Sequence, residues 1–229
     1  MKKLLLVCLL AAFAVHASYA QKRTEIDLAA IKEAVKDTAY YNNLKREFFK
    51  LHTLPTQDLV NLFYGQAFQA DYSPYDKLIW QPAIDKIMKK DGAMSALAMC
   101  FRLLEERPAY LPLLNYTINV AESAKIDKSL LVAMVMNKVK LLVLIRESGD
   151  GTIDSPLLVT SISDEHLLME VMKLQNNSQA LMEKDGRHYD MWEVTPNEMY
   201  KSDKIYFDIN LPYPELSKLF PEDETSDKN

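Results

Sequence analysis

Hydrophobic residues recur with helical periodicity along most of the chain before residue 148. Between residues 57 and 69 they form two stripes on neighbouring helix faces, one through Leu59 and Leu62 and the other through Val60 and Tyr64. A helix that is apolar on two faces needs cover on both sides, so other elements must pack around it. The pattern therefore predicts a central helix over residues 57–69.

Two residues of this stretch carry further predictions. Thr56 is the expected N-cap of the central helix, because its hydroxyl can accept a hydrogen bond from a free N–H group of the first turn. Gly65 lies in the helix interior, where glycine is about 1 kcal/mol less favourable than alanine. We interpret this glycine as a position that another backbone approaches closely.

The same periodicity predicts further helices on both sides of the central one, with proline, glycine and aspartate near their ends. Pro82 can begin a helix, because its missing N–H has no intrahelical partner in the first turn. Asp127 is the expected N-cap of the longest helix, and residues 38–42 are expected to interrupt the first two. The predicted ranges are 26–37, 44–51, 82–90, 93–106, 109–124 and 128–147.

After residue 148 the pattern becomes that of strands, with one more helix over 165–174 that Ser163 or Asp164 would cap. Asp185-Gly186 separates two strand-like runs, which predicts a hairpin with a two-residue turn. The strand-like runs are residues 157–161, 180–183, 188–194 and 204–209.

These elements predict an α+β fold. Residues 21–148 should form a tetratricopeptide-like array of helical hairpins, since short helices recur at roughly 34-residue spacing, although the signature residues of that repeat do not align. Residues 149–220 should form a small antiparallel sheet with one packed helix, as a subdomain against the array. Residues 221–229 are acidic and lack apolar side chains, which predicts a disordered tail.

The first 20 residues have the pattern of a secretory signal peptide. A basic start, a short apolar run and Ser18-Tyr19-Ala20 predict cleavage after Ala20, and hence a periplasmic or secreted protein. The alternative is a lipoprotein acylated at Cys8, although Cys8 lies early, inside the apolar run.

The composition excludes some classes of partner. The net charge is −5, which argues against nucleic acid and anionic membranes as the main partners. No later apolar run is long and charge-free enough to span a bilayer, so we expect no membrane span in the mature chain. Cys100 would be the cysteine left after cleavage; it lies on an apolar helix face and is expected to be a buried thiol without a disulfide.

Several short motifs resemble a known family. The motifs are Tyr40-Tyr41, Phe63-Tyr64-Gly65, Phe68-Gln69, Asp71-Tyr72-Ser73-Pro74-Tyr75, Tyr189-Asp190 and Ile205-Tyr206-Phe207-Asp208-Ile209. They look like a family of exported bacterial proteins catalogued as domain of unknown function 4919, and the resemblance spans nearly the whole mature chain. It implies export and a single helix-rich domain, and it brings no assigned activity or site residues.

The usual catalytic and phosphate-binding spacings are absent from the sequence. Residues 147–154 superficially resemble a calcium loop, but they lack its regular acidic ligands and its closing glutamate. We interpret them as a turn, and we predict neither a metal site nor a cofactor.

Two groups of residues are candidates for a binding site. Asp71 lies close in sequence to Tyr72, Tyr75 and Trp80, and aromatic rings beside a carboxylate suit sugars or peptides. The alternative is that these aromatic residues pack between helices, with the tyrosine hydroxyls bonded to the backbone.

The second group is His188 and Asp190, which alternate on one strand face beside Trp192. There the carboxylate could orient the imidazole for proton transfer. The alternative is a solvated strand face, because no nucleophile for such a pair is evident.

The sequence therefore favours an exported, non-enzymatic interaction module whose partner is another envelope or extracellular protein, because helical arrays provide concave binding surfaces. The alternative is a hydrolase, or a carbohydrate- or peptide-binding protein with an aromatic-lined cleft.

Overall fold

Aspartate side chains begin three of the helices. Asp27, Asp37 and Asp127 each accept hydrogen bonds from backbone N–H groups of the following turn. The structure is a computed structural model that describes residues 26–215. Its helices are α2 (Leu28–Ala34), α3 (Thr38–Phe49), α4 (Thr56–Gly65), the short 3-10 helix η1 (Gln66–Phe68), α5 (Lys77–Asp91), α6 (Ala93–Glu106), α7 (Leu111–Ser123), α8 (Lys128–Glu147) and α9 (Ile162–Val171).

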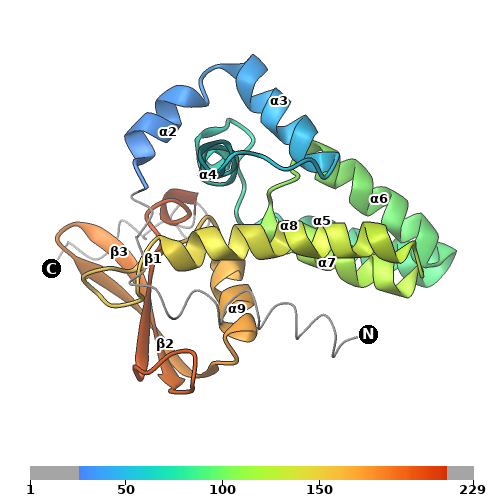
Figure 1. Ribbon diagram of the computed structural model, residues 1–229. Helices are drawn as coiled ribbons and strands as arrows, with labels where there is room; N and C mark the ends of the chain where they lie inside the picture. Colours follow the sequence, from blue (N-terminus) through green and yellow to red (C-terminus); the bar gives the residue numbers. More distant parts are fainter. Residues whose placement is uncertain (1–25, 216–229) are drawn as a thin grey trace, which may run out of the picture.

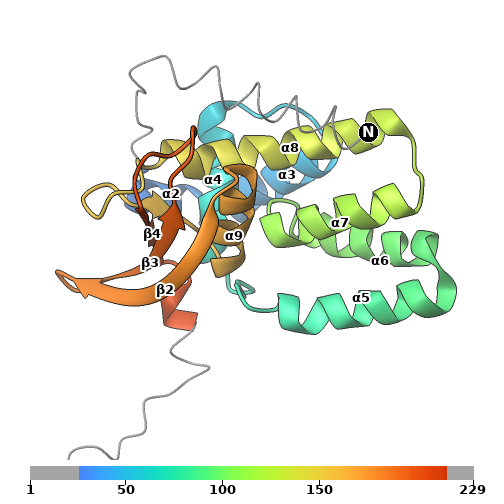
Figure 2. The same ribbon diagram turned by 90° about the horizontal axis from the view of Figure 1, so that it is seen from below.

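The helices form two groups around α4. Figure 2 shows α5, α6, α7 and α8 side by side, each packed against the next in the chain. Figure 1 shows α2 and α3 arching over α4. The sheet lies beside the C-terminal end of α8. Helices precede the sheet in the chain, with one helix inserted between strands, so the predicted α+β class is confirmed. The tetratricopeptide-like pairing stays a prediction.

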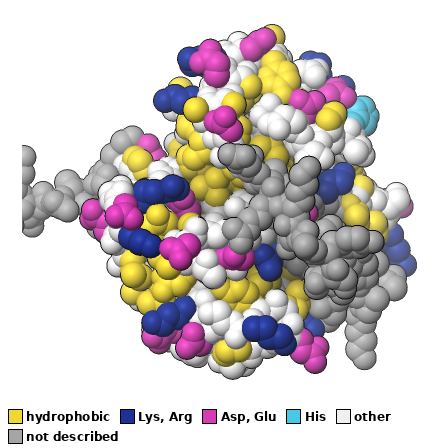
Figure 3. Space-filling view, turned by 60° about the vertical axis from the view of Figure 1, so that its left-hand side comes forward, with side chains coloured by type: hydrophobic (Ala, Val, Ile, Leu, Met, Phe, Trp, Pro, Cys, Tyr) yellow, Lys and Arg dark blue, Asp and Glu magenta, His cyan; other side chains and the backbone are white. Residues whose placement is uncertain are grey.

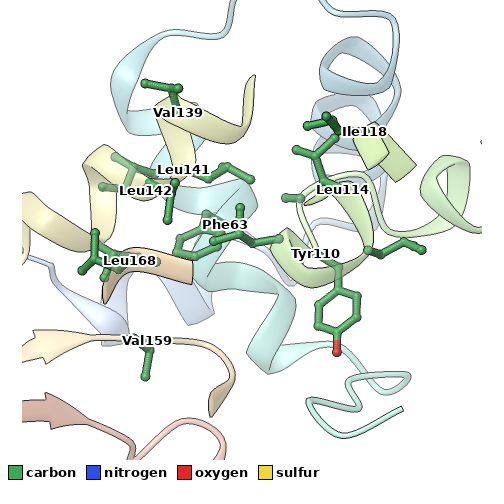
Figure 4. Packing of buried hydrophobic residues seen from close by; sticks show 14 of the residues in the cluster. Phe63, Tyr110, Leu114, Ile118, Val139, Leu141, Leu142, Val159 and Leu168 are labelled. Carbon is green, nitrogen blue, oxygen red and sulfur yellow. The ribbon is translucent and has the colours of Figure 1, made fainter. Parts of the chain in front are cut away.

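The core is centred on α4, as the two apolar stripes predict. Phe63 and Tyr64 are both fully buried, with their ring centroids 4.9 Å apart in an edge-to-face arrangement. In Figure 4 the ring of Phe63 lies between Leu142 of α8 and Leu114 of α7, with Leu168 of α9 close by. The Tyr64 hydroxyl lies 3.4 Å and 3.3 Å from the carbonyl oxygens of Leu144 and Leu158.

The ends of α4 differ from the prediction. The N-cap is Pro55, and Thr56 is already the first helical residue. The close approach at Gly65 comes from side chains rather than from another backbone. A Cβ placed there would lie 2.6 Å from Val35 Cγ1 and 3.3 Å from a ring carbon of Tyr41. A larger residue at this position would therefore push α2 away from α4.

Helices α6 and α8 match their predicted ranges, but α3, α5 and α9 begin at least three residues earlier than predicted. Residues 38–42 were expected to interrupt two helices, but they are the first residues of α3. The Asp37 cap starts this helix, and its buried stripe includes Tyr41 and Leu44. Helix α5 starts at Lys77, and Pro82 lies inside it on an exposed face, where water can replace the lost backbone hydrogen bond. Helix α9 starts at Ile162, because the Asp164 carboxylate accepts from the backbone N–H of Ser161, as in a capping box.

The described residues form a four-stranded sheet in the order β1-β4-β3-β2. Pairing is antiparallel for β2 with β3 and for β3 with β4, whereas β1 is parallel to β4, so the sheet is mixed rather than purely antiparallel. The predicted hairpin turn is confirmed, since Asp185 and Gly186 have φ of 54° and 71°, as a type I′ turn requires. The strands are β1 (Leu157–Leu158), β2 (Gln175–Lys184), β3 (Arg187–Thr195) and β4 (Lys204–Asp208).

Within residues 26–215 no helix has the length and apolar character needed to cross a membrane. The predicted signal peptide (residues 1–20) and the predicted acidic tail (221–229) lie outside the described residues.

Candidate functional site

The aromatic residues predicted near Asp71 have different surroundings. Trp80 is 8% exposed, donates from its indole N–H to Asp76 (3.2 Å), and packs edge-on against Tyr116. Tyr72 and Tyr75 are half-buried, and the Tyr72 hydroxyl donates to the carbonyl of Thr160 (2.6 Å). Trp80 and Tyr72 thus connect elements of the fold, as the packing alternative describes.

Asp71 and Tyr72 also line a small pocket of about 40 Å³, here called the polar pocket. Its wall includes the rings of Tyr41 and Tyr110 as well as the Lys45 side chain. The hydroxyls of these two tyrosines donate to backbone carbonyls at 3.2 Å. Glu106 and Arg107 also line the pocket, so the ring surfaces and four charged side chains are among the groups that a ligand could contact.

His188 and Asp190 lie on β3 but have separate partners. The His188 ring stacks on Tyr213, with centroids 3.6 Å apart and planes 13° from parallel. Asp190 is buried and accepts a hydrogen bond from the Gln179 amide (2.9 Å), and its carboxyl group also contacts Glu165. The two predicted residues are therefore held by different neighbours.

A cluster of buried acidic residues at the start of α9 was missed by the sequence reasoning. Asp164 and Glu165 are both 0% exposed, and the Trp192 indole N–H donates to Glu165 Oε2 (2.8 Å). Burial raises the pKa of the Glu165 carboxyl well above its ordinary value, and the nearby Asp190 carboxylate raises it further. In the sequence Asp164 was a candidate cap and Glu165 the first residue of the helix, because the helix was expected to begin three residues later than it does.

Asp164 has its own set of partners. One carboxylate oxygen, Oδ2, accepts from the backbone N–H and the hydroxyl of Thr160 and from the backbone N–H of Ser161, at 2.9 to 3.0 Å. Burial raises the pKa of this carboxyl to about 6, although these hydrogen bonds oppose the shift.

An apolar groove of about 190 Å³ lies between α3, α6, α7 and α8. Its only polar lining residue among those described is Asn137, whose amide donates to the Phe48 carbonyl (3.3 Å) and accepts from the Lys140 ammonium (3.3 Å). The lining residues are Phe48, Phe49, Leu51, Phe101, Leu104, Pro108, Leu114, Leu130, Met134 and Asn137. Phe48-Phe49 and Phe101 were visible in the sequence, but nothing there showed that they face one space.

Other surface features carry less information. Leu78 and Ile79 of α5 are 77% and 76% exposed, so large apolar side chains also occur outside the groove. Figure 3 shows one face of the molecule, on which positive and negative side chains are interspersed with hydrophobic ones. Such a mixed face gives no single-sign field that would select a highly charged partner.

Cys100 is a buried free thiol, as predicted, and burial raises its pKa to about 11. Among residues 26–215, no group of three or more His, Cys, Asp or Glu side chains is placed to hold a metal ion.

Comparisons with known proteins address the family. A search of curated proteins and a search of solved structures each gave no match. A family comparison matched residues 29–218, which include α2 from its second residue, the described helices after it and the four described strands. The match agrees with the resemblance seen in the short motifs around Tyr64, Tyr72 and Phe207. The chain therefore belongs to the family described as Domain of unknown function (DUF4919).

Proposed function

We propose that this chain is an exported, non-enzymatic interaction module, and that its apolar groove binds an amphipathic helix of another envelope or extracellular protein. The proposal rests on the groove between α3, α6, α7 and α8, because open apolar surface rimmed by polar residues is typical of protein interaction sites. Export is supported by the signal-peptide pattern of residues 1–20.

The spacing of the groove residues favours a helical partner. Leu130, Met134 and Asn137 extend over two turns of α8, a length of about 10 Å at 1.5 Å per residue. Phe101, Leu104 and Pro108 line the α6 side over a similar stretch. Two walls of this length match the apolar stripe of a helix with anchors at i, i+3 or i+4 and i+7.

The lining is also adaptable. Phe49 and Phe101 are half-buried, so their rings can move toward an incoming side chain. Met134 has an unbranched thioether side chain, which adjusts its shape to different apolar partners. This combination is found at binding surfaces that accept more than one apolar anchor.

Peptide display tests the proposal. A phage library of 16-residue peptides would be selected on the full-length protein, and the best peptides would be titrated by fluorescence anisotropy. We expect enrichment of apolar residues at i, i+3 or i+4 and i+7. We also expect Phe101→Glu to weaken binding at least tenfold, roughly 1.4 kcal/mol.

Met94→Glu is the matched control, because Met94 lies on the same helix, is 63% exposed and does not line the groove. It should bind the selected peptides as well as the wild-type protein does. Equal binding by both variants, or selected peptides without apolar spacing, would contradict the proposal. Circular dichroism would confirm that both variants are folded.

The polar pocket supports a second candidate, a carbohydrate- or peptide-binding protein or a hydrolase. The observation in its favour is the set of rings from Tyr41, Tyr72 and Tyr110 beside the Asp71 carboxylate, an arrangement that suits the faces and hydroxyls of sugars. His188 and Asp190 have separate partners and supply this candidate with no nucleophile.

A glycan array followed by titration calorimetry tests the second candidate. Asp71→Ala should abolish binding of any sugar that the wild-type protein retains, whereas Asp91→Ala, an exposed change at the end of α5, should not. A wild-type protein that retains no sugar on the array excludes a carbohydrate ligand for this pocket.

A further inference from the structure

Two buried carboxyl groups join α9 to the sheet. Glu165 of α9 is 0% exposed and Asp190 of β3 is 5% exposed, and their carboxyl groups are hydrogen-bonding neighbours. Each has one fixed donor on its other side, the Trp192 indole N–H for Glu165 and the Gln179 amide for Asp190. Neither proposed binding surface uses this Glu165–Asp190 pair.

The carboxyl oxygen of the pair that has no hydrogen-bond partner indicates where a proton is needed. Glu165 Oε1 is buried and accepts no hydrogen bond from the described residues. Two ionised carboxylates in contact and away from water would repel each other strongly, and Glu165 Oε1 would remain without a donor. A proton on Glu165 removes the repulsion and supplies the missing hydrogen bond to Asp190.

We propose that Glu165 and Asp190 share one proton in the folded protein, and that this proton makes the contact between α9 and β3 a pH-sensitive latch. The contact between α9 and β3 stays intact while Glu165 and Asp190 hold the proton. It opens when rising pH removes the proton, because two buried negative charges then face each other.

Charged and titratable groups from every neighbouring element act on the pair. On α9 these are Asp164, which disfavours ionisation of Glu165, and His166, which favours ionisation of Asp190 when protonated. Tyr75 and Lys77 come from the segment before and at the start of α5, and Glu215 comes from the C-terminal segment. An ionised Asp164 favours retention of the shared proton, whereas a protonated His166 opposes it. Lys77 acts on His166, and Glu215 acts on Tyr75, so both influence the pair through these neighbours.

The latch is connected to the polar pocket. The Tyr75 hydroxyl is buried near both carboxyl groups and has no hydrogen-bond partner among the described residues. Tyr72, three residues earlier, lines the pocket and bonds to Thr160, which in turn donates to Asp164 at the start of α9. Loss of the shared proton would thus loosen the segment that forms one wall of the pocket.

Carbon-detected NMR of the full-length, ¹³C-labelled protein tests the proposal directly. The carboxyl carbon of Glu165 should titrate well above the ordinary glutamate value of 4.5, because burial and the neighbouring Asp190 carboxylate disfavour its charged form. In Asp190→Asn the midpoint should move back toward 4.5, because the neighbouring negative charge is gone while Glu165 stays buried. An ordinary midpoint in the wild-type protein, or no change in Asp190→Asn, would overturn the shared proton.

Amide hydrogen exchange tests the latch. Glu165→Gln keeps a donor for Asp190 at every pH. The ratio of wild-type to variant exchange rates in α9 should therefore rise as pH increases through the Glu165 titration, because only the wild-type pair loses its proton. Glu170→Gln, an exposed change on the same helix, is the control and should exchange like the wild-type protein. A ratio that stays constant with pH would show that the proton does not hold α9 to the sheet.

Discussion

At the scale of single residues, buried tyrosines connect parts of the chain that are distant in sequence. Tyr64 of α4 reaches the carbonyls of Leu144 in α8 and Leu158 in β1, and Tyr72 reaches Thr160 just before α9. Each hydroxyl meets a backbone carbonyl of another element, so the ring fills the core while its polar end remains bonded. These side chains stabilise the packing of the helices against the sheet.

Removing the Tyr64 ring should strongly destabilise the protein. Tyr64 is fully buried, so Tyr64→Ala should lower the free energy of unfolding by about 3–5 kcal/mol, the range for large aromatic truncations in a core. Tyr72→Ala and Tyr75→Ala should lower it less, because both rings are half-buried. Thermal unfolding followed by circular dichroism would rank the three variants.

Tyr64→Phe is the matched control, since it keeps the ring and removes the hydroxyl, a change of about 1 kcal/mol. Packing would be excluded as the role of Tyr64 if Tyr64→Ala melted like the wild-type protein.

Asp164 should make stability depend on pH. Its pKa is raised to about 6 from an ordinary 3.8, so the folded state binds the proton more tightly than the unfolded state does. The stabilising contribution is complete below pH 3.8 and is lost as pH rises through 6. At pH 6 the contribution of Asp164 to the free energy of unfolding has fallen by about 3 kcal/mol, since each pKa unit corresponds to about 1.36 kcal/mol.

Urea unfolding at pH 4 to 7 would measure this effect. Comparing Glu165→Gln with the double variant Glu165→Gln/Asp164→Asn leaves Asp164 as the one group that differs between the two proteins. Their difference in unfolding free energy should change between pH 4 and 6. A difference that is constant over this range would mean that Asp164 has an ordinary pKa.

At the scale of elements, the β2–β3 hairpin shows how a local signal determines structure. Asp185 and Gly186 both have positive φ, and the pairing of Lys184 with Arg187 follows directly from a two-residue turn. The turn also places Asp190 opposite Leu181, and so sets the strand register around the Glu165–Asp190 pair.

A branched residue at Gly186 should weaken the hairpin. Its φ is 71°, and a Cβ there would meet no atom within 4 Å, so the penalty would come from the backbone alone. Gly186→Val should lower the free energy of unfolding by about 1–3 kcal/mol. Gly186→Asn is the control, because asparagine tolerates a positive φ, and it should have a smaller effect. Equal urea midpoints for wild type and Gly186→Val would argue against the type I′ turn.

At the scale of the whole molecule, the interaction proposal requires that the protein reach the compartment of its partner. If residues 1–20 are a signal peptide, the exported protein should begin at Gln21, which can cyclise to pyroglutamate. Intact-mass and N-terminal peptide analysis of the secreted or periplasmic fraction would measure this. An intact Met1, or an acylated Cys8, would contradict cleavage after Ala20.

Much of the fold follows from local signals. The ranges of α6 and α8 match their predictions because Gly92, Pro108 and Asp127 give clear ends, and the Asp185-Gly186 turn determines its own hairpin. Family membership also follows from sequence, since the short motifs between Tyr40 and Ile209 all lie within the region that the family comparison matched.

Helix starts were harder to predict where several caps compete. Asp37 extends α3 back across residues 38–42, and Asp164 starts α9 at Ile162 although Ser163 offered a later cap. Each earlier start adds a buried residue, Tyr41 in α3 and Asp164 in α9, and such packing outweighs the small differences in local propensity.

The sequence alone determined what depends on neighbours along the chain: the hydrophobic stripes, the hairpin turn, the family and the predicted leader. Only the tertiary structure brought Glu165 against Asp190, closed the apolar groove from Phe48 to Asn137, and placed Asp71 beside Tyr110. These sites combine side chains from segments far apart in the sequence. Their chemistry depends on burial and on partners that no local pattern encodes.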